Sequence, residues 1–246
     1  MLGLGLKLSL STAKSSAGGF TPASISGLTN WYQLKTGITD DSGVSEWLDQ
    51  SGNGNDLTQT VSGNRPPYNS ITGAVEFKAD GDTLKLDTDT SLGAFTFFMV
   101  VELDTDTNPS GTYHGLWQGT FTNRMHLWGL TGNLFFDLNA SDGVNSDGVG
   151  IGAITNDPAD NDKFVLMVTK SAASNATVNV YIDNAESFSD TDFDENIPVA
   201  LRNFGYTQIT SRFMNGNAYE LGFYDSELSS SDRTDLYNDL VTRHSL

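Results

Sequence analysis

The stretch that decides the fold of this chain is residues 43–57, which read Gly43-Val44-Ser45-Glu46-Trp47-Leu48-Asp49-Gln50-Ser51-Gly52-Asn53-Gly54-Asn55-Asp56-Leu57. An apolar-alternating run around Trp47 stops at Asp49, and small polar residues and glycine dominate from there to Leu57. This pattern predicts a strand that ends in a tight turn, where Gly52 and Gly54 take positive φ angles and Asn and Asp side chains bond to the turn's own backbone. We therefore expect Trp47 to be buried, with Asp49 making turn hydrogen bonds beside it.

Short strand signals recur along the rest of the chain and predict an all-β protein. Clusters of Gly, Asn, Asp and Ser separate them, which favours a sandwich of sheets over alternating strands and helices. One helix is expected to start at Ser229, with Asp232 completing a capping box. A length of 246 residues fits one sandwich domain. The expected strands are 31–34, 44–48, 74–77, 95–102, 113–117, 125–128, 134–138, 164–168, 178–182 and 218–224.

Three further motifs follow in order. They read Asn64-Arg65-Pro66-Pro67-Tyr68, then Ala74-Val75-Glu76-Phe77-Lys78-Ala79-Asp80-Gly81-Asp82-Thr83-Leu84, then Phe213-Met214-Asn215-Gly216-Asn217-Ala218-Tyr219-Glu220-Leu221-Gly222-Phe223-Tyr224-Asp225. With residues 43–57, this ordered set resembles the laminin-G-like, concanavalin A-like jelly-roll modules of bacterial and phage surface proteins. The resemblance covers about residues 24–246 and implies a two-sheet antiparallel jelly-roll β-sandwich with a short C-terminal helix. One departure is Gly81, which lies one residue later than in those modules.

The charge of the chain excludes some partners and suggests others. A formal charge of −18, from 31 acidic against 13 basic residues, opposes binding to nucleic acid. Aspartates are predicted to gather in loops such as 87–89 and 190–194, where they form either a hydrated surface or a Ca²⁺ site. The candidate Ca²⁺ ligands are Asp80 and Asp82. The chain has no cysteine, and no apolar run long enough to span a membrane.

Residues 1–22 differ from the rest and are predicted to form an extended arm and tether ahead of a sandwich domain at 23–246. Alternating leucines predict a β-strand with one apolar face, formed by Leu2, Leu4, Leu6, Leu8 and Leu10. A signal peptide is disfavoured because Lys7 lies inside the apolar stretch. The strand either completes the protein's own sandwich or adds to a partner's sheet. The flexible composition of residues 11–19 favours the second interpretation, an anchor.

No catalytic residues are predicted. Laminarinase-type glycosidases of this fold carry paired glutamates in the pattern E-x-D-x-x-E, and no glutamate of this chain lies in that pattern. Glu220 is interpreted as a structural residue of the last strand. The three histidines are too scattered along the sequence for a metal triad, and there is no Gly-x-Ser-x-Gly motif. We therefore expect the protein not to be an enzyme.

A glycan site is the better candidate, on the neighbouring segments 113–117 and 125–128. Sugars stack on flat aromatic rings while polar side chains bind their hydroxyl groups. Strand alternation would place Trp117 on one face and His114 and Leu116 on the other. The alternative is that these aromatic residues belong to the sandwich core. The candidate glycan-binding residues are Tyr113, Trp117, His126 and Trp128.

The glycine-leucine leader at residues 1–10, ahead of a module of this kind, resembles the leaders of tailed-phage virion proteins. This resemblance implies a non-enzymatic structural and adhesion protein at a phage virion surface, as a capsid decoration, head fibre or tail fibre. The expected partners are a capsid or tail protein, reached through the arm, and a surface glycan, with a homo-oligomer left open. Nucleic acid and membrane are not expected partners. The first alternative is a carbohydrate-binding module of a secreted bacterial protein, and a glycoside hydrolase ranks below it.

Overall fold

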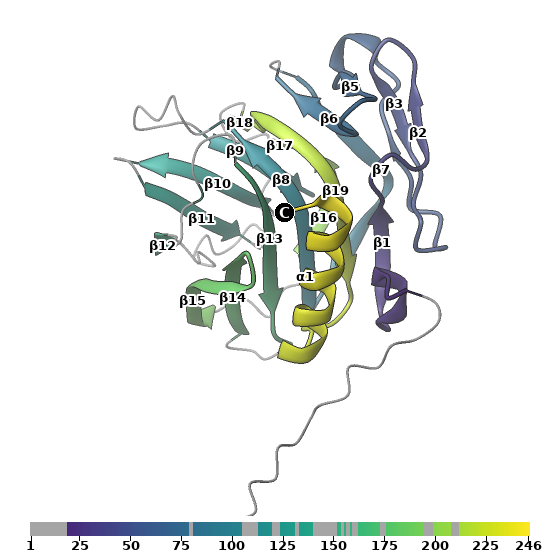
Figure 1. Ribbon diagram of the computed structural model, residues 1–246. Helices are drawn as coiled ribbons and strands as arrows, with labels where there is room; N and C mark the ends of the chain where they lie inside the picture. The colour runs from purple at the N-terminus through teal and green to yellow at the C-terminus, as the bar shows by residue number, and fades with distance from the viewer. Residues whose placement is uncertain are drawn as a thin grey trace, which may run out of the picture.

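The computed structural model describes residues 19–78, 81–104, 113–119, 124–130, 133–139, 152–153, 155, 158, 162–172, 176–193, 199–207 and 212–246. In these ranges two antiparallel sheets pack face to face as a jelly-roll β-sandwich, and a C-terminal helix covers one of them (Figure 1). The all-β prediction is confirmed.

Sheet A is the sheet that the helix covers. Its strand order is β15-β14-β13-β8-β19-β6-β5, and β1 pairs with the end of β19. Strands β8 and β13 are buried along almost their whole length because both of their faces are covered, which explains their continuous apolar sequences. The strands of sheet A are β1 (Leu28–Tyr32), β5 (Tyr68–Asn69), β6 (Ala74–Phe77), β8 (Phe95–Leu103), β13 (Lys163–Lys170), β14 (Ala176–Ile182), β15 (Ala185–Phe193) and β19 (Gly216–Tyr224).

Sheet B faces sheet A across the core. Its strand order is β12-β11-β10-β9-β16-β7-β4-β3-β2. The hairpin of β17 (Tyr206–Thr207) and β18 (Arg212–Phe213) continues from β16 and packs beside β9. The strands of sheet B are β2 (Ile38–Asp40), β3 (Val44–Trp47), β4 (Leu57–Thr58), β7 (Leu84–Leu92), β9 (Tyr113–Gln118), β10 (Arg124–Leu130), β11 (Asn133–Asn139), β12 (Gly152–Ala153) and β16 (Val199–Phe204).

Two aspartate-rich runs that were expected to be loops lie mainly in strands, so that expectation is wrong. Residues 87–89 belong to β7, and residues 190–193 belong to β15. In β7, Leu84 and Leu86 point into the core, whereas Lys85 and Asp87 are exposed on the outer face. A strand with one solvated face tolerates charged residues at every second position, and the antiparallel pairing supplies the backbone hydrogen bonds.

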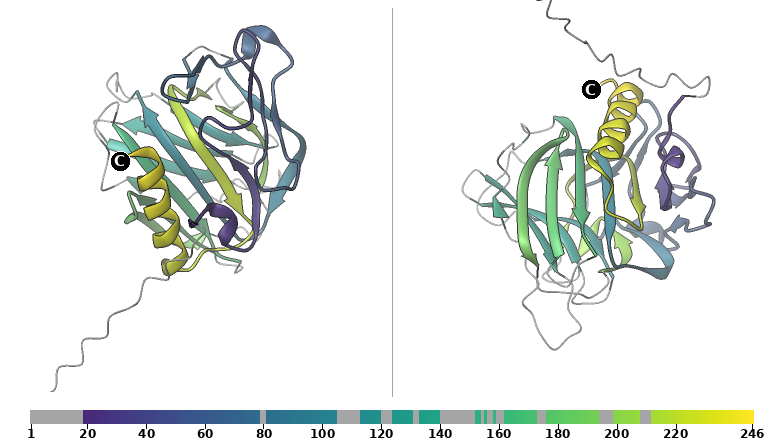
Figure 2. Two further views of the ribbon diagram at one scale, coloured as in Figure 1. Left: turned by 45° about the vertical axis from the view of Figure 1, so that its right-hand side comes forward. Right: turned by 90° about the horizontal axis from the view of Figure 1, so that it is seen from below.

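Apolar side chains form two layers, one on each face of sheet A. The layer between the sheets includes the fully buried Trp47, as predicted. The second layer lies between sheet A and helix α1 (Ser230–His244), where Leu236 and Leu240 are fully buried. Figure 2 shows α1 and the segment around the short helix η1 (Pro22–Ser24) on the same face of the sandwich. The predicted helix start is confirmed, because the Ser229 hydroxyl accepts a hydrogen bond from the Asp232 N–H at 3.2 Å. The Asp232 carboxylate accepts from that hydroxyl at 2.7 Å, rather than from the Ser229 N–H as in a capping box.

The loop after β3 has the predicted tight turn. Gly52 and Gly54 have φ angles of +89° and +74°, which a residue with a Cβ atom seldom adopts. Asp49 Oδ1 accepts a hydrogen bond from the Trp31 N–H at 2.9 Å, and the Asn55 amide donates to the Thr29 carbonyl at 3.0 Å. The loop therefore binds both its own backbone and the free edge of β1.

The first described residues of the chain contact the second apolar layer. Phe20 packs against this layer, and the Tyr224 hydroxyl donates to the Pro22 carbonyl at 2.9 Å. The predicted anchoring strand with its five leucines lies outside the described residues. In the part of the chain that the structure describes, no helix is both long and apolar enough to cross a membrane.

Candidate functional site

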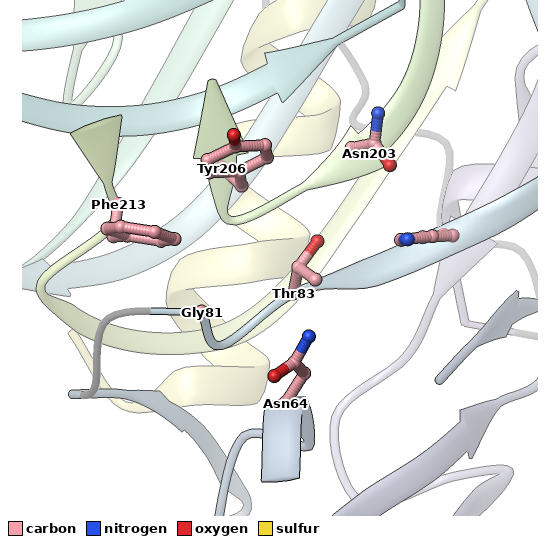
Figure 3. Close-up of a pocket in the computed structure, with 7 residues that line it drawn as sticks. Asn64, Gly81, Thr83, Asn203, Tyr206 and Phe213 are labelled. Carbon is pink, nitrogen blue, oxygen red and sulfur yellow. The ribbon is translucent and has the colours of Figure 1, made fainter. Parts of the chain in front are cut away.

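A pocket of about 270 Å³ opens on sheet B, between the short helix η2 (Ser62–Asn64), the start of β7 and the β17–β18 hairpin. Figure 3 shows Asn64 approaching from the side opposite Tyr206 and Asn203, with Thr83 between them. Three separate parts of the sequence meet here, at residue 64, at 81–85 and at 203–213, and their distance along the chain hides the site from sequence patterns. The lining residues are Asn64, Gly81, Thr83, Lys85, Asn203, Tyr206 and Phe213.

Two aromatic rings form one wall of the pocket. Tyr206 and Phe213 are opposite each other in the hairpin and stack with ring centroids 5.0 Å apart and planes at 28°. Both side chains are half-buried. Gly205 turns the chain from β16 into the hairpin with a φ of +84°, and a Cβ atom there would lie 2.3 Å from the Phe77 ring. The position of the aromatic wall thus depends on glycine at 205.

Polar groups surround these rings. The Thr83 hydroxyl donates to the Phe204 carbonyl at 3.1 Å, and the Asn203 amide donates to the Gln118 carbonyl at 3.3 Å, so both side chains are oriented. The Asn64 carbonyl accepts from the Thr83 N–H at 3.1 Å and holds η2 against β7. The pocket therefore combines an aromatic wall with amide and hydroxyl groups in fixed positions.

The pocket differs in charge from the rest of the molecule. Its described lining contains no carboxylate and one ammonium group, that of Lys85, although the chain has 31 acidic and 13 basic residues. The Lys85 side chain is exposed, and within the described ranges its ammonium has neither an ion pair nor a hydrogen bond. This lining can accept a neutral or an anionic ligand.

A second hollow of about 220 Å³ continues along β7 from the first. Lys85 lines both hollows. Its register partners are Thr58 on β4 and Asn203 on β16, so a row of polar residues crosses the sheet at this point. The second hollow is lined by Thr58, Gln59, Thr60, Val61, Lys85, Leu86, Asp87 and Arg202.

A third hollow, of about 470 Å³, has an acidic character and lies near the ends of β8 and β19. Its carboxylates are occupied by neighbouring side chains. Glu102 accepts hydrogen bonds from the Asn217 amide at 2.9 Å and from the Tyr219 hydroxyl at 2.8 Å. Asp104 accepts from the Asn215 amide at 3.0 Å. These bonds give both carboxylates a structural role at the end of the sandwich.

The structure corrects the predicted glycan site. Trp117 is fully buried, with its ring centroid 5.0 Å from that of Phe204 and 5.2 Å from that of Phe223, so it cannot stack on a sugar. His126 is also buried. Tyr113 and Trp128 lie on β9 and β10, but their side chains are outside the described part of the structure. For Trp117, the core interpretation is confirmed.

A β-bulge explains this correction. The pairing of β9 with β10 shifts register between Met125 and His126, which pair with Trp117 and Gly115 respectively. Strand alternation is interrupted at this point, and both Leu116 and Trp117 point into the layer between the sheets. The prediction that these two residues face opposite sides is therefore wrong.

Of the two candidate Ca²⁺ ligands, the structure describes Asp82 alone. Asp80 lies outside the described residues. Asp82 is buried, and its carboxylate accepts a hydrogen bond from the Lys78 N–H at 2.9 Å, which closes the loop before β7. Across the described ranges, no group of three acidic or histidine side chains is arranged to bind a metal ion.

Glu220 lies at the centre of a buried polar cluster beneath α1. Its side chain is fully buried, and it accepts a hydrogen bond from the Trp31 indole N–H at 2.7 Å. It also pairs with Arg243 and, at 2.9 Å, with His244 from the last turn of α1. This geometry supports the predicted structural role of Glu220.

Comparisons with known proteins show the fold. No family model matches the chain, and no curated protein sequence matches it. Among solved structures, domain 4 of AbnA, a GH43 extracellular arabinanase from Geobacillus stearothermophilus in complex with arabinotriose, is similar with a TM-score of 0.60 and 19% identity. The match covers 85% of this chain and 98% of that domain.

Two larger proteins contain a similar sandwich. The ligand-binding domain of botulinum neurotoxin serotype D, in complex with N-acetylneuraminic acid, matches with a TM-score of 0.63 and 15% identity over 88% of this chain and 52% of that one. Trypanosoma rangeli sialidase matches with a TM-score of 0.58 and 14% identity over 88% of this chain and 33% of that one. The chain therefore spans about half of the toxin domain and a third of the sialidase.

Proposed function

We propose that this protein is a non-enzymatic glycan-binding adhesion module whose binding site is the pocket beside Tyr206 and Phe213. The observation that carries the proposal is the stacked ring pair in a hollow with the Asn64, Thr83 and Asn203 side chains. The C–H face of a sugar packs against aromatic rings, and its hydroxyl groups bind amides and hydroxyls. This lining offers both kinds of contact within one small volume.

The structural comparisons support the same class of ligand. One similar domain is in complex with arabinotriose and another with N-acetylneuraminic acid. Since one fold supports many functions, these likenesses support the proposal through the sandwich they share, and the pocket chemistry supplies the specific argument.

We propose binding without hydrolysis. Most glycosidases need two carboxyl groups on either side of the scissile bond. The described residues that line the pocket offer none, and Lys85 is their charged group. Incubation with oligosaccharides should therefore leave the chain length of the sugar unchanged, which chromatography of the products measures.

The biological setting that we propose is the surface of a larger assembly, with a phage virion as the first candidate. The support is the sequence of residues 1–22, where the leucine pattern and tether suit attachment to a capsid or tail protein. The alternative setting is a secreted bacterial protein, in which the same pocket serves as a carbohydrate-binding module. Electron microscopy of the protein in its native assembly distinguishes the two.

The test of glycan binding is a glycan array followed by calorimetric titration of the best ligands. Tyr206→Ala and Phe213→Ala are expected to weaken binding about fivefold or more, because the stacking of a sugar on a ring contributes on the order of 1 kcal/mol. Tyr206→Phe, which keeps the ring, should retain most of the affinity.

The matched control is Tyr237→Ala, which removes a half-buried tyrosine from α1, on the other sheet. This variant should bind as the wild type does, and melting curves verify that all variants are folded. If folded Tyr206→Ala and Phe213→Ala variants bind every array ligand with unchanged affinity, the pocket is not the glycan site.

A further inference from the structure

The two hollows on sheet B share Lys85 as a lining residue, so one elongated ligand can reach both. Along this stretch of chain, Thr83, just before β7, lines the first hollow, and Asp87, within β7, lines the second. Each hollow alone is smaller than the roughly 300–1,000 Å³ of most ligand sites, whereas the two together reach that range. A ligand that fills the site must therefore extend along β7, past Lys85, as a chain of sugar units does.

The charge of the residues that line the hollows indicates which class of sugar they bind. Lys85 occupies the junction of the hollows, and its ammonium has no partner in the described structure. An exposed ammonium gains little from a neutral hydroxyl group but forms a stronger, charge-assisted hydrogen bond with a carboxylate. In a chain of net charge −18, a hollow with a free cation and no described carboxylate suits a ligand that carries negative charge.

The acidic surface elsewhere does not prevent this binding. Charges farther from the ligand than about 8 Å are largely screened at physiological ionic strength, so nearby groups dominate. Asp87 lines the second hollow but not the first. Arg202 also lines the second hollow and lies 3.6 Å from Asp89 in an exposed ion pair. A ligand carboxylate is thus best placed at Lys85 on the side of the first hollow.

We propose that the site binds an acidic oligosaccharide along β7, with the carboxylate of a uronic-acid or sialic-acid unit on the Lys85 ammonium and a ring of the chain against Tyr206 and Phe213. This inference rests on the proposed function and specifies the ligand class of the same site. Thr58 and Asn203, the register partners of Lys85, supply hydroxyl and amide contacts on either side.

The experiment compares each acidic ligand with its neutral methyl ester. Calorimetry measures the binding of oligogalacturonide trimers and of a sialyl trisaccharide, each as free acid and as ester, to the full chain. One of the free acids is expected to bind about tenfold more tightly than its ester, which corresponds to one charge-assisted hydrogen bond. Which of the two acids binds identifies the source of the carboxylate. The corresponding acidic monosaccharide should bind at least tenfold more weakly than the trimer.

Three variants assign the effect to one ammonium group. Lys85→Met should bind acid and ester equally, and Lys85→Arg should keep most of the preference for the acid. The control is Lys78→Met, since Lys78 is an exposed lysine that pairs with Glu76 of β6, on the other sheet. It should behave as the wild type.

The outcomes separate this inference from the proposed function. If acid and ester bind with equal affinity while Tyr206→Ala abolishes both, the protein binds glycans but the role of Lys85 is wrong. A monosaccharide that binds as well as the trimer overturns the elongated site. If neither acidic nor neutral oligosaccharides bind the folded wild type, the proposed function fails, and this inference with it.

Discussion

Asp49 connects the loop after β3 to the rest of the sandwich. Its Oδ1 accepts from the N–H groups of Trp31 and Ser51, and its Oδ2 accepts from the Ser51 hydroxyl and the Asn55 N–H. The Asn53 amide in the same loop donates to the Leu28 carbonyl at 3.0 Å. The most distinctive polar sequence of the chain therefore closes the free edge of β1, which is a structural function.

The first prediction concerns this residue. Asp49→Ala should lower the free energy of unfolding by about 2–3 kcal/mol, because it leaves partly buried N–H groups without their charged acceptor. Urea denaturation measures the change. The control Asp87→Ala removes an exposed carboxylate from β7 and should change stability by no more than about 0.5 kcal/mol. Equal stability of the two variants would contradict the structural role of Asp49.

His114 makes the stability of the protein depend on pH. Burial lowers the pKa of its imidazole to about 4, and its Nδ1 lies 3.3 Å from the Asn215 N–H, which donates to it. The unfolded chain binds the proton near the ordinary pKa of 6.5. Between these two values the unfolded state holds more protons, so stability falls as the pH falls through this window.

The second prediction follows from this loss of stability at low pH. Between about pH 7 and pH 4, protonation of His114 in the unfolded chain should lower the free energy of unfolding by on the order of 3 kcal/mol. The variant His114→Asn keeps a hydrogen-bond acceptor but cannot titrate, so it should lack this part of the loss. Urea denaturation of both proteins at several pH values measures the difference. Parallel pH profiles of the wild type and the variant would show that His114 does not titrate in this way.

Helix α1 is attached to sheet A by apolar packing and by the Glu220 cluster. Leu236 and Leu240 are fully buried against the sheet. Glu220 binds Arg243 and His244 from the last turn of the helix, and Arg243 also lies over the Trp31 ring at 5.5 Å from its centroid. The cluster thus links α1, β19 and β1, which are far apart in the sequence.

The third prediction concerns the attachment of α1 through Glu220. Glu220→Gln should cost about 3–5 kcal/mol, because it leaves Arg243 and His244 near a buried neutral group. Thermal unfolding measures the loss, and amide hydrogen exchange should show faster exchange in α1. Glu227→Gln, at an exposed position before the helix, serves as the control. If α1 exchanges at the wild-type rate in Glu220→Gln, the cluster does not hold the helix.

The two sheets of the sandwich differ in what lies on their outer sides. Helix α1 and the segment around η1 lie on the outer face of sheet A (Figures 1 and 2). The hollows around Lys85 are lined by residues of sheet B and of its adjoining loops. The described chain begins at Gly19, close to Phe20, which packs on the α1 side. If the protein is anchored through residues 1–18 on this side, as we propose, the proposed glycan pocket on the other sheet stays accessible.

The fourth prediction concerns the N-terminal arm, residues 1–19. A protein that lacks residues 1–19 should fold with nearly wild-type stability and should bind glycans, but it should no longer join its assembly. Five leucines on one strand face would each gain roughly 1.5–3 kcal/mol from burial, so the arm needs a sheet or groove outside the domain. Circular dichroism, calorimetry and sedimentation measure the three properties. A truncated chain that does not fold would show that the arm is a strand of its own sandwich.

The sequence by itself determined the features that depend on neighbouring residues. The turn at Gly52 and Gly54 and the helix start at Ser229 were predicted because glycine conformations and capping bonds form within a few residues. Most strands of the sandwich were also predicted from their apolar patterns. The aspartate-rich β7 and β15 were not, because a strand with charged residues on its solvated face resembles a polar loop in sequence.

Tertiary structure alone decided the location of the site. The bulge in β9 turned Trp117 into the core, although an unbroken strand pattern allowed it to face a ligand. The pocket joins Asn64, Thr83, Asn203 and Tyr206 through the pairing of β7 with β16 and the packing of η2. Which strands become neighbours depends on the burial of apolar side chains throughout the whole domain, so no local pattern in the sequence encodes this site.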